Sequence, residues 1–338
     1  MKFIYYLIIF FLLIVTIFVI SSDNTLKFNG KIKNNFFVSP EKKKLNFLWS
    51  KGLQEKNDYM LDKTENISDN ETIIKQIKED IVWIRLGSKN KEETCDLDLF
   101  SKNLEILEKE IILVTSDGDK SVPGDLKKET YSKIINHPKI KKWYTQNYDK
   151  SEVNEKLKHY PIGFDLHTSR SFFGLPIPFL PKKSIVDKIN YLLELRKNNK
   201  NKLKKIFSDV HLSCNQKFNN ERKRVKEILN DSPYFYPLKI RTNQEDIWKK
   251  YSSYKFVIST HGNGLDCHRT WEIIFLGGIV ITKTSSLDEI FQNLPVVIVK
   301  DWDECLKKEN LDLWDKKYTP LTSEENINKY YLYDTWLK

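Results

Sequence analysis

The stretch of sequence that decides the fold spans residues 254–282 and reads YKFVISTHGNGLDCHRTWEIIFLGGIVIT. It begins with a short apolar run, passes through a turn with two glycines, continues with helix-forming residues and ends in a second apolar run. This order predicts a buried strand, a turn, a helix and a second, parallel strand. In open parallel sheets, ligands bind where the carboxyl ends of the strands meet the following helices. We therefore expect the turn and the start of the helix to carry a binding site.

The turn and the helix start contain residues that suit an anionic ligand. Gly262 and Gly264 have no side chain, so the backbone at the turn could approach a diphosphate closely. Asn263 and Asp266 are placed to cap the helix that follows, which we expect over residues 266–276. The turn is therefore predicted to bind the phosphates of a donor molecule.

The polar residues of this helix suit the rest of a nucleotide. His268 and Glu272 are four residues apart and share one face, and Arg269 lies beside that face. A guanidinium can bind phosphate through two parallel hydrogen bonds, and a carboxylate one turn later can accept from ribose hydroxyls. The alternative is an ion pair between Arg269 and Glu272 within the helix, beside a solvated histidine.

Residues 250–304 resemble the carboxy-terminal part of exostosin-like glycosyltransferases and, more loosely, of fucosyltransferase-like enzymes. The resemblance rests on the strand at 254–259, on Arg269 and Glu272, and on the apolar segments at 276–280 and 294–299. It implies the GT-B fold, with two Rossmann-like domains that face each other across a cleft. It also implies an inverting transferase that uses a nucleotide-activated sugar, with Glu272 at the ribose and Arg269 at the diphosphate.

The rest of the chain predicts two successive α/β series, which we assign to domains at 77–183 and 184–338. The boundary is placed in the connector 168–183, where Gly174, Pro176, Pro178 and Pro181 interrupt regular structure. The elements expected in the first domain are strands at 81–86, 110–115, 142–146 and 159–164 and helices at 97–109 and 125–136. Those expected in the second are helices at 184–199, 219–229, 244–251, 266–276 and 323–337 and strands at 205–212, 255–260, 279–282 and 296–299.

The chain starts with an apolar run, Phe3 to Ile20, that is long enough to cross a bilayer. Eighteen residues in a helix span about 27 Å. We expect residues 1–21 to be a membrane anchor rather than a cleaved signal, and the polar segment 22–76 to be a stem. Three glycosylation sequons, at Asn66, Asn70 and Asn230, agree with a single-pass (type II) protein whose catalytic part is lumenal, in the Golgi or endoplasmic reticulum.

The overall charge does not indicate a nucleic-acid partner. The net charge is +10, but the 56 basic residues are interspersed with 46 acidic ones and form no continuous basic patch in the sequence. The four cysteines lack the spacing of a structural zinc site, although one or two disulfides are possible. The expected partners are a nucleotide-sugar donor, a glycan or glycoprotein acceptor and the membrane.

Several further residues are candidates for the site because they follow predicted strands. An inverting transfer needs one base near the acceptor hydroxyl. The eligible bases are Asp117, Asp119, Asp165, His167 and His261. His211, Lys283 and Ser285 are further candidates for donor binding.

We expect no cofactor to be required, but two alternatives stay open. Asp117-Gly-Asp119 is a DxD sequence, which in GT-A transferases binds a divalent cation at the donor diphosphate. The first alternative is therefore a metal-dependent GT-A enzyme, or a transferase of another activated group such as pyruvyl. The second is a membrane-tethered glycan-binding protein without enzymatic activity.

Overall fold

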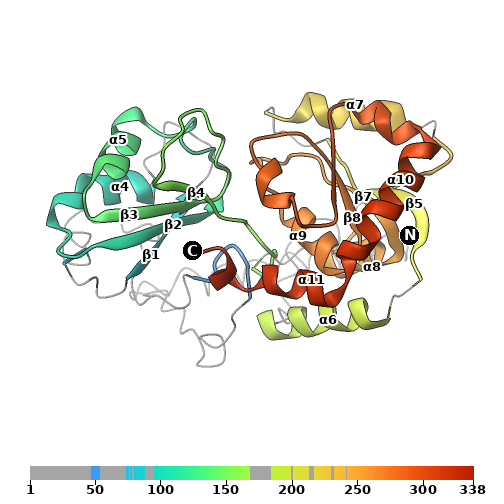
Figure 1. Ribbon diagram of the computed structural model, residues 1–338, viewed down its shortest axis with the longest axis horizontal. Helices are drawn as coiled ribbons and strands as arrows, with labels where there is room; N and C mark the ends of the chain where they lie inside the picture. Colours follow the sequence, from blue (N-terminus) through green and yellow to red (C-terminus); the bar gives the residue numbers. More distant parts are fainter. Residues whose placement is uncertain are drawn as a thin grey trace, which may run out of the picture. The chain divides into compact units, whose positions relative to one another are not determined.

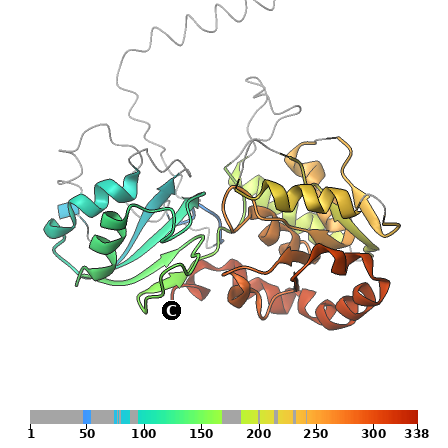
Figure 2. The same cartoon turned by 90° about the horizontal axis from the view of Figure 1, so that it is seen from above.

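The computed structural model describes residues 47–53, 74–75, 77, 80–87, 95–167, 184–198, 201–212, 217–229, 232–240 and 242–338. Both sheets belong to one compact unit, residues 41–338. In Figures 1 and 2 the blue and green residues build the first sheet, and the yellow to red residues build the second. The architecture is therefore mixed α/β with two parallel sheets.

The first sheet contains four parallel strands in the order β1-β2-β3-β4. Helices α4 and α5 contact each other, and they also contact β1 and β3, respectively. The elements are β1 (Ile81–Gly87), α4 (Asp96–Lys102), the 3-10 turn η1 (Leu104–Ile106), β2 (Ile111–Gly118), α5 (Lys128–Asn136), β3 (Ile140–Thr145) and β4 (Leu157–His159).

The second sheet contains five parallel strands in the order β6-β5-β7-β8-β9. The strands are β5 (Leu203–Ser208), β6 (Phe235–Pro237), β7 (Tyr254–Ile258), β8 (Ile279–Lys283) and β9 (Val296–Val299). The helices are α6 (Ile185–Asn198), α7 (Asn219–Leu229), α8 (Gln244–Ser253), α9 (His268–Phe275), α10 (Lys308–Tyr318) and α11 (Glu324–Asn328). The 3-10 turns are η3 (Asp288–Phe291), η4 (Trp302–Leu306), η5 (Thr319–Thr322), η6 (Lys329–Tyr331) and η7 (Tyr333–Thr335).

The strand, turn, helix and strand predicted for residues 254–282 are confirmed as β7, α9 and β8. Four of the five residues of β7 are buried, because the strand lies between two others. Trp271, Ile274 and Phe275 of α9 are buried in the core, as its apolar positions predict. The unit therefore places residues 259–267 at the carboxyl end of the sheet.

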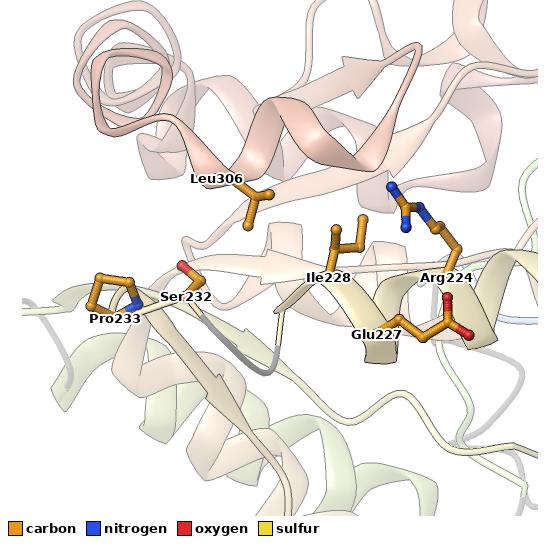
Figure 3. Close-up of a pocket in the computed structure, with 6 residues that line it drawn as sticks. All are labelled: Arg224, Glu227, Ile228, Ser232, Pro233 and Leu306. Atoms are coloured by element: carbon orange, nitrogen blue, oxygen red, sulfur yellow. The ribbon is translucent and has the colours of Figure 1, made fainter.

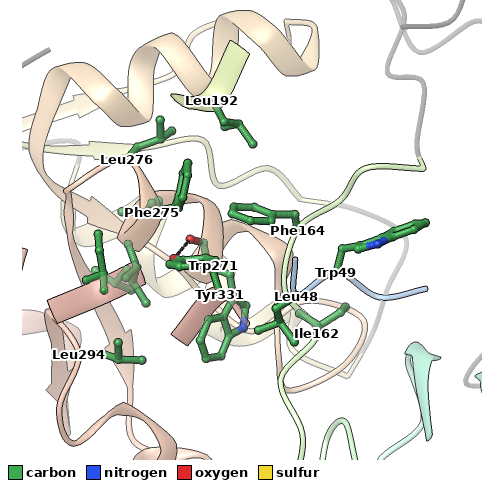
Figure 4. Close-up of a cluster of buried hydrophobic side chains, with 14 of the residues drawn as sticks. Leu48, Trp49, Ile162, Phe164, Leu192, Trp271, Phe275, Leu276, Leu294 and Tyr331 are labelled. Atoms are coloured by element: carbon green, nitrogen blue, oxygen red, sulfur yellow. Dashed lines mark hydrogen bonds between the residues drawn. The ribbon is translucent and has the colours of Figure 1, made fainter. Parts of the chain in front are cut away.

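Part of the segment predicted to be a stem belongs to the core instead. Leu48 and Trp49 are almost completely buried, and they share a cluster with Phe164, Phe275 and Tyr331 (Figure 4). The backbone around them is held by isolated bridges from residue 47 to 332 and from 49 to 164. The short apolar island within the polar sequence therefore packs into the folded unit, and the prediction of a stem is wrong for residues 47–53.

Three predicted elements are much shorter in the structure. The strand expected at 159–164 ends at 159, because Pro161 has no N–H to donate and Gly163 has a φ of 65°, outside the range of strands. The helix expected at 323–337 ends at 328 and continues as 3-10 turns, where residue 332 pairs with residue 47. The helix expected at 97–109 ends at 102 and is followed by η1. Strand β6 and helix α10 were not predicted.

Several sequence-based predictions fall outside the described residues. The apolar run at 3–20, the connector at 168–183 and the sequons at Asn66, Asn70 and Asn230 are among them. Within the described residues, no helix combines the length and the apolar character that a membrane span needs. The three described cysteines, Cys95, Cys267 and Cys305, are all free thiols.

Candidate functional site

A group of charged side chains lies at the carboxyl end of the first sheet and in the segment after β4. We call it the His167 cluster. Its members are Lys51, Arg85, Asp117, Asp165 and His167.

Asp117 is the centre of this group because the fold presents its carboxylate to three partners. The residue lies near the end of β2 with a φ of 59°, and Gln146 Oε1 accepts its backbone N–H. Its carboxylate lies 3.0 Å from Arg85 Nε and 3.4 Å from Lys51 Nζ. Its other oxygen is 3.8 Å from His167 Nε2. The Asp117 carboxylate therefore contacts two cationic side chains and a histidine.

His167 lies between two carboxylates and near one hydroxyl. Its Nδ1 is 3.5 Å from Asp165 Oδ1 and 3.3 Å from Ser50 Oγ. Burial lowers the pKa of His167, and the charges of Asp165 and Asp117 oppose that shift. The ring is therefore neutral at neutral pH, and a neutral imidazole can accept a proton from a hydroxyl group.

A second group lies where β5 and β7 end and where α7 and α9 begin. We call it the His261 cluster. Its members are Asp209, His211, Glu221, Arg222, His261 and Arg269.

Arg269 is paired with Asp209, not with Glu272. Its Nε is 3.0 Å from Asp209 Oδ1, and Tyr251 donates its hydroxyl proton to Asp209 Oδ2 at 2.9 Å. Burial acts to lower the pKa of Arg269, but Asp209, Tyr251 and Cys267 together outweigh burial and raise that pKa. The intrahelical Arg–Glu pair considered as an alternative is therefore not formed.

Arg222 connects the two strand ends. Its Nε donates to the carbonyl of His261 at 3.0 Å, and its Nη1 donates to the carbonyl of His211 at 3.2 Å. Burial lowers the pKa of Arg222, and the charge of Arg269 lowers it further. The cluster thus holds two guanidinium groups close enough to repel each other. His211 itself is exposed.

Backbone and side-chain hydrogen bonds join α9 and its preceding turn to the segment after β4. His268 Nδ1 lies 2.8 Å from the carbonyl of Gly163, and the N–H of Asp165 is 3.4 Å from Glu272 Oε1. The rings of His268 and His167 are 6.1 Å apart. The structure therefore confirms that His268 and Glu272 share a face, and it brings that face to the His167 cluster.

The space beside each glycine of the turn is filled by another side chain of the protein. A Cβ at Gly264 would lie 2.5 Å from Asn147 Nδ2, and a Cβ at Gly262 would lie 2.8 Å from Cys267 Sγ. Neither glycine has a positive φ. Packing therefore explains both glycines, and their contact with a diphosphate stays a prediction.

Asp266 does not cap the helix, which corrects the sequence-based prediction. The N-cap of α9 is Cys267, and its side chain makes no capping bond. The Asp266 carboxylate instead accepts from the N–H of Ile162 at 2.7 Å and from Trp271 Nε1 at 2.9 Å. Burial raises the pKa of Asp266 to about 6, although these hydrogen bonds oppose the shift. Its contacts fit a structural role, because they fix the turn to the segment after β4.

The remaining candidates lie apart from the two clusters or have local partners. Ser285 Oγ accepts from the N–H of Leu287 at 3.2 Å, and Lys283 is half-buried at the end of β8. Asn263 is exposed at the tip of the turn. The N–H of Asp119 donates to the carbonyl of Gly87 at 3.0 Å. Donor binding by these residues stays a prediction.

The predicted DxD site has only one carboxylate in the His167 cluster. Asp117 faces two cationic side chains, which compete with a metal ion for its oxygens. In the described part of the chain, no group of three or more His, Cys, Asp or Glu residues has the geometry to hold a metal ion. A divalent cation at Asp117 and Asp119 therefore stays an untested expectation.

A pocket of about 500 Å³ lies away from both clusters (Figure 3). Its lining comes from the end of α7, the segment before β6 and the end of η4. Because α7 returns the chain from the carboxyl end of β5 to the start of β6, this pocket lies at the amino end of the sheet. The residues that line it are Arg224, Glu227, Ile228, Ser232, Pro233 and Leu306.

Sequence reasoning missed several members of the clusters. Asp209 was overlooked because it lies inside a predicted strand, and Glu221 because charged residues dominate its helix. The early position of Glu221 and Arg222 in a helix that follows a strand was an available signal. Lys51 and Arg85 carried no such signal, because their proximity to Asp117 depends on tertiary structure.

No protein-family model matches the chain, and no curated protein matches it. Among solved structures, it is similar to an alpha,alpha-trehalose 6-phosphate synthase from Burkholderia multivorans, with a TM-score of 0.43 and 11% identity over 84% of this chain and 74% of that chain. It is also similar to a UDP-forming trehalose-phosphate synthase from Burkholderia xenovorans, with a TM-score of 0.41 and 11% identity over 80% and 76% of the two chains.

Proposed function

We propose that the chain is a glycosyltransferase of the GT-B kind, which moves a sugar from a nucleotide-sugar donor to a glycan or glycoprotein acceptor. The observation that carries this proposal is the position of His167. It lies 3.5 Å from Asp165 and 3.8 Å from Asp117, and its ring is 6.1 Å from that of His268, the first residue of α9. A proton acceptor thus lies beside the helix that the sequence assigns to the donor.

The start of α9 offers the groups that a nucleoside diphosphate needs. The first N–H groups of a helix attract anions, and the side chain of Cys267 leaves them uncapped. The guanidinium groups of Arg269 and Arg222 add positive charge at the neighbouring strand ends. Glu272, one turn into the helix, is assigned to the ribose hydroxyls. These cations would balance the charge of the diphosphate without an essential metal ion.

The proposed reaction is a direct displacement that inverts the anomeric configuration. His167 takes the proton of the acceptor hydroxyl, and Asp117 and Asp165 stabilise the imidazolium that forms. The acceptor oxygen bonds to the anomeric carbon while the bond from that carbon to the phosphate oxygen breaks. The electron pair of the broken bond leaves with the nucleoside diphosphate.

A membrane location is part of the proposal on sequence grounds. The apolar run from Phe3 to Ile20 would anchor the chain and leave the catalytic part in the lumen of the secretory pathway. We propose it as an exostosin-like enzyme on the basis of the resemblance over residues 250–304.

Nucleotide binding is the first test. The full chain, solubilised in detergent, is heated with UDP, GDP, ADP and CMP in turn, with and without EDTA. A nucleotide present at 100 times its Kd should stabilise the fold by about 2.7 kcal/mol and raise Tm by a few degrees. Consumption of the matching nucleotide sugars is then measured with a glycan acceptor mixture. If no nucleotide raises Tm and no donor is consumed, the proposal fails.

Glu272 variants test the ribose assignment. Glu272→Gln retains an oxygen that can accept from the N–H of Asp165, whereas Glu272→Ala removes it. If the carboxylate binds ribose hydroxyls, both variants should weaken nucleotide binding by tens-fold, equivalent to about 2 kcal/mol. Calorimetry of both variants with the selected nucleotide measures this effect. Unchanged affinity in Glu272→Gln would remove Glu272 from the donor site.

A further inference from the structure

Glu221 holds His261 by two hydrogen bonds. Its Oε2 is 2.7 Å from His261 Nδ1, and its Oε1 accepts the backbone N–H of the same residue at 3.2 Å. Both side chains are about nine-tenths buried, and the ring of Phe218 lies 5.1 Å from the imidazole. This contact fixes the ring orientation, and it keeps a proton on Nδ1 because a carboxylate only accepts.

The other ring nitrogen of His261 is left for a ligand. Among the described residues, none forms a hydrogen bond with Nε2. Two further polar atoms near the same strand ends, Thr260 Oγ1 and Arg269 Nη1, are buried and lack a hydrogen-bond partner in the described structure. Buried polar groups are normally paired, so unpaired ones at one strand end indicate the place of a polar ligand.

The charges around His261 favour an anion as that ligand. Arg222 donates to the carbonyl of His261, and Arg269 lies close enough for its charge to destabilise that of Arg222. Asp209 and Glu221 are already engaged with Arg269 and His261. An anion beside the two guanidinium groups would relieve their repulsion.

We propose that His261 is the catalytic residue that donates a proton from Nε2 to the leaving diphosphate, and that Glu221 positions it for this step. The inference rests on the proposed glycosyltransferase function and adds a role to it. As the bond between the anomeric carbon and the phosphate oxygen breaks, its electron pair goes to that oxygen, which takes the proton of the His261 imidazolium. His167 gains the proton of the acceptor hydroxyl while His261 loses one to the leaving oxygen, and proton exchange with water then restores both histidines.

Two variants separate this role from a structural one. His261→Gln removes the proton donor but keeps a side chain that can bond to Glu221, and Glu221→Gln removes the charge that stabilises the imidazolium. His137→Gln is the matched control, because His137 is a mostly buried histidine at the end of α5, outside both clusters.

The first readout is the proton balance of nucleotide binding. Calorimetry with UDP, or with GDP if the thermal screen selects it, is repeated at pH 7.5 in buffers of different ionisation enthalpy. The wild type and His137→Gln should take up more protons per nucleotide than His261→Gln, because only they carry the proposed proton donor beside the bound diphosphate. Equal proton balance in all three proteins would overturn the proposal.

The second readout is the dependence of kcat on pH. A proton donor gives the wild type a loss of kcat on the basic side. His261→Gln should lower kcat by about 10²-fold to 10⁴-fold and remove the basic limb, and Glu221→Gln should move that limb to lower pH. A basic limb that persists in His261→Gln would overturn the proposal. Absence of nucleotide binding by the wild type would instead refute the proposed function, so the two failures are distinguishable.

Discussion

The two histidine clusters differ in exposure and in the number of their partners. The side chain of His167 is 34% exposed and lies near two carboxylates, a hydroxyl and, through Asp117, two cations. The side chain of His261 is 8% exposed, and a single carboxylate binds both its ring and its backbone. The first is open to an arriving molecule, whereas the second is fixed before anything binds.

Because of this difference, His167 and His261 suit different steps of the proposed reaction. A partly exposed, neutral imidazole suits the acceptance of a proton from an acceptor that arrives from solvent. A buried imidazolium that a carboxylate holds at Nδ1 suits a bound anion at Nε2, because the ordering of its ring is complete beforehand. We therefore propose the His167 cluster as the site of the acceptor and the His261 cluster as the site of the donor diphosphate.

Replacement of His167 should have the largest effect. His167→Ala removes the proposed base, so kcat should fall by about 10²-fold to 10⁴-fold while the affinity for nucleotide changes little. The acidic limb of the pH profile should disappear, and the basic limb assigned to His261 should remain. Steady-state kinetics from pH 5 to 9 measure both. A variant that keeps the acidic limb would assign the base to another residue.

The next largest effect is the loss of stability when one ion pair in each cluster is broken. Arg269→Met leaves Asp209 buried with Tyr251 as its remaining described partner, so the free energy of unfolding should fall by about 3–5 kcal/mol. Arg85→Met is the matched control. It removes a cation that is 34% exposed and leaves Lys51 beside the buried Asp117, so it should cost about 1 kcal/mol or less.

Urea unfolding measures both free energies. Similar costs for the two variants would show that the clusters do not differ in rigidity. Arg269→Lys adds a separate test of phosphate binding, because a point charge does not reproduce the two-pronged contact of a guanidinium. Its affinity for the selected nucleotide should fall by tens-fold.

The sequence predicted the second sheet better than the site. The strand at 296–299 and the helix at 219–229 have the predicted bounds, because local apolar patterns decide them. The segment 47–53 was misassigned because its burial depends on residues such as Phe164 and Tyr331, more than 100 positions away. Local patterns carry no information about such contacts.

The same limit applies to the candidate site. The histidines, Asp117 and Asp165 were found because they follow predicted strands. The partners that were not found are Lys51, Arg85, Asp209 and Glu221. Arg269 illustrates the point, since a helical spacing of three suggested Glu272 and the fold instead supplied Asp209 from another strand end. Residue types could be predicted, whereas pairing required the packed structure.

Asp266 lies in the segment that joins the two clusters, and its titration should have a smaller effect on the free energy of unfolding. Its pKa is raised by burial from 3.8 to about 6, so its contribution to stability is complete below pH 4 and is lost as the pH rises through 6. Asp266→Asn does not titrate. The stability advantage of the wild type over this variant should therefore shrink by at most about 3 kcal/mol between pH 4 and pH 7. Parallel unfolding profiles in urea would show that the carboxyl does not titrate in this range.

The smallest expected effect tests the contact that joins the clusters. Asn147 Oδ1 accepts the N–H of Asp266 at 2.7 Å, its Nδ2 donates to the carbonyl of Gly118 at 3.1 Å, and its amide fills the space beside Gly264. Gly264→Ala should cost about 1–3 kcal/mol, because its Cβ would overlap the amide. In the Asn147→Ala background the added methyl group has room, so the same change should cost about 1 kcal/mol less.

A double-mutant cycle by urea unfolding measures this coupling, and the single variant Asn147→Ala shows whether the contact also matters for activity. Because Asn147 touches both the turn before α9 and the end of β2, its loss should lower kcat more than it weakens nucleotide binding. Additive stability effects together with an unchanged kcat would mean that the two clusters act independently, and the histidines would then need no common positioning contact.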